Sequence, residues 1–149
     1  MPNQIKPSGE DGLALQITKP ARSSGLVKED SEGDVTYRAD VRVYAFDHLL
    51  LVIDLDQLRT AETAELIVAA TQDTKSVYRA MDAAVQIAGN GYQVQLPPAA
   101  DAGFREGDRA PCQPSPGLLV ISRDDGTSAG ADAARLAQDL VTIRNDQVH

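Results

Sequence analysis

The sequence contains no tryptophan, only two phenylalanines and four tyrosines, and a single cysteine. With so little aromatic bulk, a core must be built mainly from Val, Leu, Ile and Ala. A hydrophobic content of 42% over 149 residues is enough for one domain with tails. Cys112, being alone, excludes an intramolecular disulfide and a cysteine-based metal cluster, and it is typical of a reducing compartment.

Lysine is also scarce. The chain has four lysines against ten arginines, and its net charge is −8. Because phosphate contacts need clustered Lys and Arg, this balance argues against general polyanion binding. The Asp-rich, Lys-poor, Ala-rich composition resembles that of proteins from salt-loving archaea, in which a solvated acidic surface is an adaptation to molar salt. On that interpretation the charge would say little about partners.

Long apolar runs are missing as well. Residues 1–10 carry no hydrophobic signal region, and no stretch approaches the length needed to cross a bilayer. We therefore expect a cytoplasmic, acidic protein that does not contact a membrane.

The chain divides into three zones. Residues 1–34, rich in Pro, Ser, Gly and acids, are expected to form a flexible, disordered acidic tail, with at most one short strand. Residues 35–123 form a β-rich body. After the polar linker 124–127, residues 128–146 are predicted to form a C-terminal amphipathic helix capped by Ser128 or Asp132. Its apolar face must pack on the body or on a partner; that face comprises Ala133, Leu136, Leu140 and Ile143.

Within the body the hydrophobic pattern is mainly that of strands. Val41 and Val43 alternate with Arg42, and residues 49–55, apolar except for Asp54, form a run suited to a buried strand. Residues 57–70 fit either a helix or the start of a strand, and both interpretations stay open. The fold class is therefore mainly β with α.

The stretch AGNGYQVQLPP, residues 88–98, predicts a hairpin arm. Gly89, Asn90 and Gly91 can adopt the positive φ of a tight turn, and the alternation from Tyr92 to Leu96 gives a strand with one buried face. Pro97 and Pro98 lack N–H donors and should end that strand.

The order of elements from Val85 to Arg123 resembles the swapped-hairpin domain of AbrB, MazE and SpoVT proteins. The matching positions are Val85, Ile87, Gly89 to Gly91, Val94, Leu96-Pro97, Ala99 to Phe104, Gly107-Asp108 and Leu119 to Ile121. The resemblance implies a small swapped-hairpin β-barrel, in which two hairpins interdigitate. A single unit would need a second copy, so a homodimer is expected.

The chain also offers a second copy within itself. A shift of 44 positions places Val41 on Val85 and Val52 on Leu96 without a gap, so residues 35–79 could be a degenerate first repeat and 80–123 the second. A true duplication would give an intramolecular pseudo-dimer. Chance matching of Val and Leu is an equal rival.

The resemblance further implies DNA binding, as a transcriptional regulator or an antitoxin. The positions that contact DNA in the family carry Gln86, Asn90, Tyr92 and Gln93 here, where cations are usual; Asp101 and Ala102 stand in the short helix. Asn and Gln can read base edges, but positioning on phosphates normally needs Arg or Lys. The substitutes nearest in sequence are Arg79, Arg105, Arg109 and Arg123.

An enzymatic role is not expected, and neither is a cofactor or a metal. His48 and the terminal His149 are the only histidines available for acid–base chemistry near neutral pH. The alternative to DNA binding is a non-enzymatic protein-interaction module that retains the barrel, has lost DNA binding and holds its partner through the 133–143 helix or the acidic tail.

Overall fold

The computed structural model describes residues 6–8, 12–73, 79–88, 91–96 and 102–148. Eight strands form one antiparallel sheet: β1 (Lys6–Ser8), β2 (Gly12–Gln16), β5 (Asp40–Phe46), β6 (Leu49–Asp54), β7 (Arg79–Ala88), β8 (Gly91–Gln95), β9 (Cys112–Ser115) and β10 (Leu118–Ser122). Their order across the sheet is β1-β2-β8-β7-β5-β6-β10-β9. A separate hairpin joins β3 (Val27–Glu29) to β4 (Val35–Arg38).

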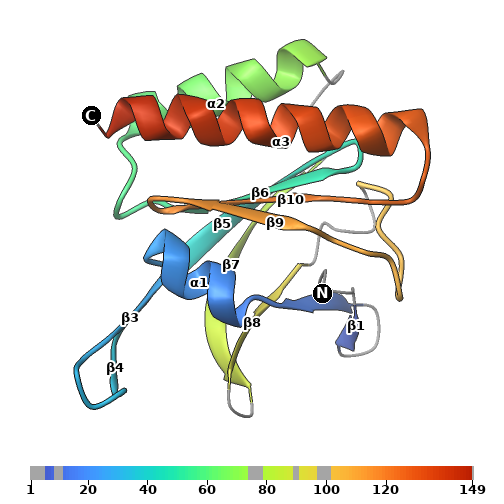
Figure 1. Ribbon diagram of the computed structural model, residues 1–149. Coiled ribbons are helices and arrows are strands. Elements are labelled where there is room, and N and C mark those ends of the chain that lie inside the picture. Colours follow the sequence, from blue (N-terminus) through green and yellow to red (C-terminus); the bar gives the residue numbers. More distant parts are fainter. Residues whose placement is uncertain (1–5, 9–11, 74–78, 89–90, 97–101, 149) are drawn as a thin grey trace.

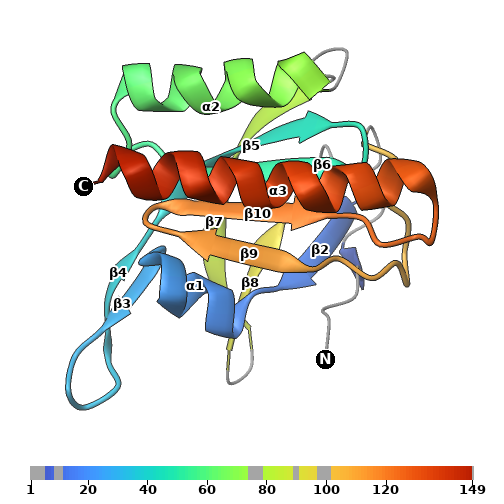
Figure 2. The same ribbon diagram turned by 45° about the horizontal axis from the view of Figure 1, so that its top comes forward.

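Three helices cover this sheet: α1 (Thr18–Ser24), α2 (Thr60–Asp73) and α3 (Ser128–Gln147). Helices α2 and α3 lie side by side on one face, whereas α1 lies on the other side, next to β9 (Figures 1 and 2). The sheet curls into a half-barrel as it passes from β10 to β8. The expected mixture of β and α, with a C-terminal helix, is confirmed.

Two hydrophobic cores lie on opposite faces of the curled sheet. The concave core includes Leu15, Val43, Val52, Val94, Phe104 and Ile121. The second core lies beneath α2 and α3 and includes Phe46, Leu51, Ile53, Leu66, Leu136 and Leu140. Strands β6 and β10 are covered on both faces, which explains why each is a run of apolar residues that meets a polar residue only at its end, Asp54 in β6 and Ser122 in β10.

Helix α3 is capped one residue earlier than predicted. The Thr127 side chain accepts a hydrogen bond from the Gly130 N–H at 3.2 Å, so Thr127 takes the role expected of Ser128 or Asp132. The apolar face of α3 packs on the chain's own sheet: Ala133, Leu136, Ala137 and Leu140 are buried, and Ile143 is half-buried against the same core. Of the side chains expected to hold a partner, three are therefore buried within the chain and Ile143 is partly covered.

The ambiguous segment 57–70 is helical over most of its length. Helix α2 begins at Thr60, after a turn that follows β6. The Glu62 carboxylate accepts a hydrogen bond from the Arg59 N–H at 2.8 Å, which is half of a capping box. Leu66 and Ala70, one turn apart, are fully buried under this helix.

Within the predicted tail, residues 1–34, the one short strand that the sequence allowed is present as β2, but the disorder expected of the rest is wrong from Thr18 onward. Strand β2 pairs with β8, bringing Leu15 opposite Val94, and α1 follows directly. Leu15, Ile17, Ala21 and Leu26 are fully buried in the concave core. A short alternating apolar set that is isolated in the sequence thus becomes part of the sheet through a long-range pairing. Residues 1–5 and 9–11 lie outside the described part.

The predicted repeat extends no further than a hairpin. Strands β5 and β6 form one hairpin, closed by the pair Phe46 and Leu49, and β7 and β8 form another, closed by Ala88 and Gly91. A 44-residue shift would instead place Phe46 on Asn90. The segments that follow the two hairpins also differ. The first hairpin is followed by helix α2, whereas the described residues after the second contain turns at 102–103 and 106–107 and then strands β9 and β10. Pro97, Pro98 and residues 99–101 lie outside the described part.

None of the described helices is long and apolar enough to cross a membrane.

Candidate functional site

The residues predicted to contact DNA lie in two separate regions. The backbone of Arg79 pairs with Ala45 at one end of β7, next to the β5–β6 turn, whereas Gln86 lies near the other end. Gln86 lies seven positions after Arg79 along this extended strand, roughly 23 Å at 3.3 Å per residue. Asn90 lies outside the described residues. The structure therefore does not bring the predicted set onto one surface.

Three glutamines form a row at one end of the sheet. Gln86 of β7 pairs with Gln93 of β8, and Gln93 pairs in turn with Gln16 of β2. Gln16 and Gln86 are exposed and Gln93 is half-buried. The next residue, Tyr92, is 4% exposed and its ring lies 5.5 Å from the Arg22 guanidinium, so it is not available for the contact expected of it.

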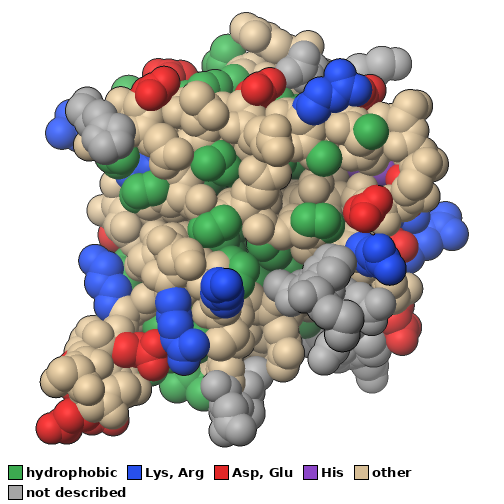
Figure 3. Space-filling view, in the orientation of Figure 1, with side chains coloured by type: hydrophobic (Ala, Val, Ile, Leu, Met, Phe, Trp, Pro, Cys, Tyr) green, Lys and Arg blue, Asp and Glu red, His purple; other side chains and the backbone are tan. Residues whose placement is uncertain are grey.

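The other predicted arginines are Arg105, Arg109 and Arg123. Arg123 lies next to the β5–β6 turn, away from the glutamine row; it is the least exposed of the three, and its side chain is paired. Arg123 Nε donates to Asp108 Oδ2 at 2.7 Å, and its Nη1 lies 3.3 Å from Asp125 Oδ2. Arg105 and Arg109 are exposed, and the Arg109 backbone forms an isolated bridge with Asp124. On the face shown in Figure 3, Lys and Arg side chains are spread over several places with acidic side chains between them.

A histidine stands at the centre of this charge cluster. Ring nitrogens of His48 lie 2.7 Å from Asp47 Oδ1 and 2.9 Å from Asp125 Oδ2. Partial burial lowers the pKa of His48, but the two carboxylates outweigh it and hold the pKa above the ordinary value of 6.5. Asp47, His48, Asp108, Arg123 and Asp125 are called the His48 cluster below.

Asp125 is the hub of the His48 cluster. The Thr127 hydroxyl, against the opposing effect of burial, lowers the pKa of Asp125 well below 3.8, and the Thr127 N–H and His48 add to the effect. Asp125 therefore stays ionised while it contacts His48, Arg123 and the cap of α3. Such a network anchors the β5–β6 turn to the start of α3.

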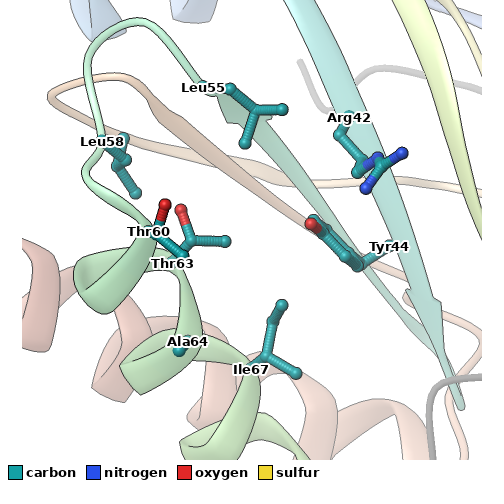
Figure 4. Close-up of a pocket in the computed structure, with 8 residues that line it drawn as sticks. All are labelled: Arg42, Tyr44, Leu55, Leu58, Thr60, Thr63, Ala64 and Ile67. Carbon is teal, nitrogen blue, oxygen red and sulfur yellow. The ribbon is translucent and has the colours of Figure 1, made fainter.

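A groove lies between β5 and α2, on the face of the sheet that carries the helices (Figure 4). Its volume is about 370 Å³, at the small end of the range for ligand pockets. Arg42 and Tyr44 come from β5, and Thr60, Thr63, Ala64 and Ile67 come from α2 on the opposite side. Leu55 and Leu58 complete it from the segment that joins β6 to α2. These eight residues define the β5–α2 groove.

The β5–α2 groove combines an apolar lining with one unsatisfied hydroxyl. Leu58 is buried and Ile67 is half-buried, whereas Leu55 is 47% exposed. Thr63 is 6% exposed, and its hydroxyl oxygen has no hydrogen-bond partner among the described residues. A buried hydroxyl without a partner costs about 1–3 kcal/mol, so Thr63 is a place where a bound polar atom would be stabilising.

Arg42 is the charged member of the β5–α2 groove. Its Nε donates to Asp82 Oδ1 at 3.0 Å, and the two side chains are 44% and 78% exposed. A guanidinium carries five N–H donors, so this pair uses one of them. Arg42 can therefore bind an anionic group at the edge of the groove.

The sequence alone does not reveal this groove. Ala64 fits the helical interpretation of 57–70, but Thr63 carries no signal, because an isolated threonine on a helix is ordinary. Arg42 and Tyr44 alternate with buried valines, which predicts that they share a face of β5. That α2 would lie beside this face depends on a tertiary contact with no local signature.

Comparison with protein-family models, with curated proteins and with solved structures finds no match for this chain.

Proposed function

We propose that this protein is a non-enzymatic protein-interaction module that holds a segment of its partner in the β5–α2 groove. The observation that carries the proposal is the combination of a half-exposed Leu55 with a buried, unpartnered Thr63 hydroxyl in one groove of the described part of the chain. An exposed apolar side chain next to an unsatisfied polar group is stabilised when a partner covers both.

Support for a non-enzymatic role comes from the geometry of His48. Both ring nitrogens contact carboxylates, and the side chain is 14% exposed. A general base needs a nitrogen within hydrogen-bond reach of a substrate proton. His48 is instead used to connect the β5–β6 turn to Asp125.

The position of the partner differs from the one that the sequence suggested. Because most of the apolar face of α3 is buried within the chain, the proposal assigns the partner to α2 in its place. Val68, 55% exposed, extends the apolar surface of α2 beyond the groove. A partner segment can therefore contact α2 on both sides of Ala64.

The test is co-purification from the source cells with a blocked groove. Ala64 lines the groove and is exposed, so A64E should exclude the partner by its bulk and charge without disturbing the core. Ala134 is an exposed alanine of α3 outside the groove, and A134E is the matched control. We expect a stoichiometric partner with the wild type and with A134E, and its loss with A64E. An equal yield with A64E, or no stoichiometric partner at all, contradicts the proposal.

DNA binding, as an AbrB-like regulator or antitoxin, is the second candidate. One observation favours it: Gln86 and Gln93 form a cross-strand pair on an exposed part of the sheet, and paired amides can read base edges. Anisotropy titrations with genomic DNA fragments at low and at molar KCl test this candidate. Saturable, sequence-dependent binding that Q86A/Q93A abolishes would support it. Absence of binding at both salt concentrations would eliminate it.

A further inference from the structure

We infer that the β5–α2 groove binds the C-terminal residue of its partner chain, an aliphatic residue with a free carboxylate. The inference rests on the proposed function, since it names the part of a partner protein that the groove holds. Three features of the groove lead to it: a cation at its edge, an unpartnered hydroxyl in its wall among the described residues and an apolar lining.

The cation is the feature that selects a carboxylate. Arg42 is the charged residue that lines the groove, in a protein whose net charge is −8. Guanidinium and carboxylate groups form strong, geometrically specific hydrogen bonds. Asp82 already offers Arg42 a carboxylate from β7, but the Asp82 side chain is 78% exposed and is free to give way to a competing anion.

The hydroxyls give the carboxyl end of the ligand a second contact. Thr60, Thr63 and Tyr44 all line the groove, and in Figure 4 the Tyr44 hydroxyl points from β5 toward the two threonines of α2. The Thr63 hydroxyl, buried and without a partner among the described residues, can donate to a carboxylate oxygen after a small rotation of its side chain.

The apolar lining selects the side chain of the same residue. Leu58, Ala64 and Ile67 form the apolar wall, and Leu55 stands exposed beside it. About 370 Å³ admits one or two residues and is too small for a docked helix. A C-terminal Leu, Ile or Val brings an aliphatic side chain and a carboxylate within one residue, as the neighbouring apolar and polar parts of the groove require.

An internal acidic residue would be a poorer fit. Its side chain would carry the carboxylate, but the aliphatic group would have to come from a neighbouring residue, with the backbone passing through the same small space. A free aliphatic acid has the same chemistry as a chain end, so the experiment must separate these two sources.

The experiment is a fluorescence anisotropy titration with labelled hexapeptides. One peptide ends in leucine with a free carboxylate, the second is its C-terminal amide, and the third has the leucine moved to an internal position. We expect the amide to bind about tenfold more weakly than the free acid, because it loses the charge-assisted contact. R42Q should abolish the difference between the two, whereas D82N should strengthen binding of the free acid severalfold by releasing the Arg42 guanidinium.

A second readout separates binding from folding. T63V should weaken binding of the free-acid peptide severalfold while leaving the protein at least as stable to urea as the wild type. Equal affinity for the acid and the amide, or no binding of either, overturns the inference. Equal affinity for 4-methylpentanoic acid and for the leucine-ended peptide also overturns it, in favour of a small-acid site. If co-purification still depends on Ala64 in any of these cases, the protein-interaction proposal survives and only the chain-end inference fails.

Discussion

His48 Nε2 lies 2.9 Å from Asp125 Oδ2, and this contact joins the β5–β6 turn to the residue that organises the cap of α3. The same imidazole contacts Asp47 on its other side. His48 also adopts a φ of 60°, a left-handed conformation that non-glycine residues rarely take. An unfavourable backbone conformation persists only when the surrounding structure holds it in place, and the contacts of the His48 ring with Asp47 and Asp125 are part of that surrounding structure.

The first prediction concerns pH. Because the folded pKa of His48 is raised, its contribution to stability is present below pH 6.5 and is lost as the pH rises through the folded pKa. Asp125, with a lowered pKa, contributes above pH 3.8 and loses its contribution only in strong acid. We therefore expect the urea midpoint to fall from about pH 5.5 to about pH 8.5.

H48N is the matched variant for this test. Asparagine tolerates the left-handed conformation, so the substitution removes the titrating ring without adding backbone strain. The fall in urea midpoint over the same pH range should be smaller in H48N than in the wild type. Parallel pH profiles for the two proteins would show that the His48 cluster is not the source of the effect.

The second prediction concerns a buried carboxylate at the end of β6. Asp54 is fully buried and accepts hydrogen bonds from the Tyr37 hydroxyl and from Gln57 Nε2, each at 2.6 Å. Burial, followed by the contact with Asp54, raises the pKa of Tyr37 far above 10, so the hydroxyl stays a donor. Y37F should lower the free energy of unfolding by about 1.5–3 kcal/mol, the range for a hydrogen bond to a charged group.

The Tyr37 substitution has an internal comparison. Tyr44 is also half-buried, but it lies in the β5–α2 groove, away from the fully buried Asp54. Y44F should therefore cost less than Y37F in a urea titration. Equal losses would mean that the contact with Asp54 is not what makes Tyr37 important.

The third prediction concerns Thr63. Valine has nearly the shape of threonine and removes a buried hydroxyl that has no partner among the described residues. T63V should raise the free energy of unfolding by about 1 kcal/mol. T60V, at an exposed position of the same helix, should change it by no more than about 0.5 kcal/mol. A loss of stability in T63V would show that the hydroxyl makes a stabilising contact in solution.

The sequence predicted those elements whose signals are local. The alternation at Val41 and Val43, the arm from Tyr92 to Leu96 and the C-terminal helix appear where their periodicity placed them. The run 49–55 is also a strand as far as Asp54, whereas Leu55 is exposed in the turn that follows. The apolar pattern of each of these elements is contained within about ten consecutive residues, so it can be recognised without knowledge of the fold. The sequence did not decide between a helix and a strand over residues 57–70, because the apolar residues there fit both, and only the structure identifies the helix at 60–73.

What could not be predicted depends on contacts between distant segments. The pairing of β2 with β8 turns part of an apparent tail into a strand, and Arg123 meets Asp108 only after the chain has folded. The β5–α2 groove likewise exists only because α2 lies beside Tyr44. Such contacts carry no short-range pattern, so composition alone assigns these residues to a tail or to surface charges.

The glycine turn of AGNGYQVQLPP shows the same limit at a single residue. The sequence allows a positive φ at Gly91 as part of the turn, but this residue begins β8 and is not among the described glycines with positive φ. A Cβ at Gly91 would instead collide with Thr18 Oγ1, the atom that accepts a hydrogen bond from the Tyr92 N–H. Gly91 therefore provides the space in which the start of α1 approaches β8.

The last prediction is a coupling between Gly91 and Thr18. G91A should destabilise the protein by about 1–3 kcal/mol through overpacking, and T18A by about 1 kcal/mol through the lost hydrogen bond. In the double variant the alanine methyl no longer meets Oγ1, so the combined loss should be smaller than the sum by about 1 kcal/mol or more.

G33A is the control, because Gly33 has a φ of 84° and no described atom lies within 4 Å of the position that an alanine methyl would take there. Its cost is backbone strain alone and should add to that of T18A without coupling. If G91A and T18A were equally additive in urea unfolding, the glycine would be needed for its backbone and not for the space that it leaves to Thr18.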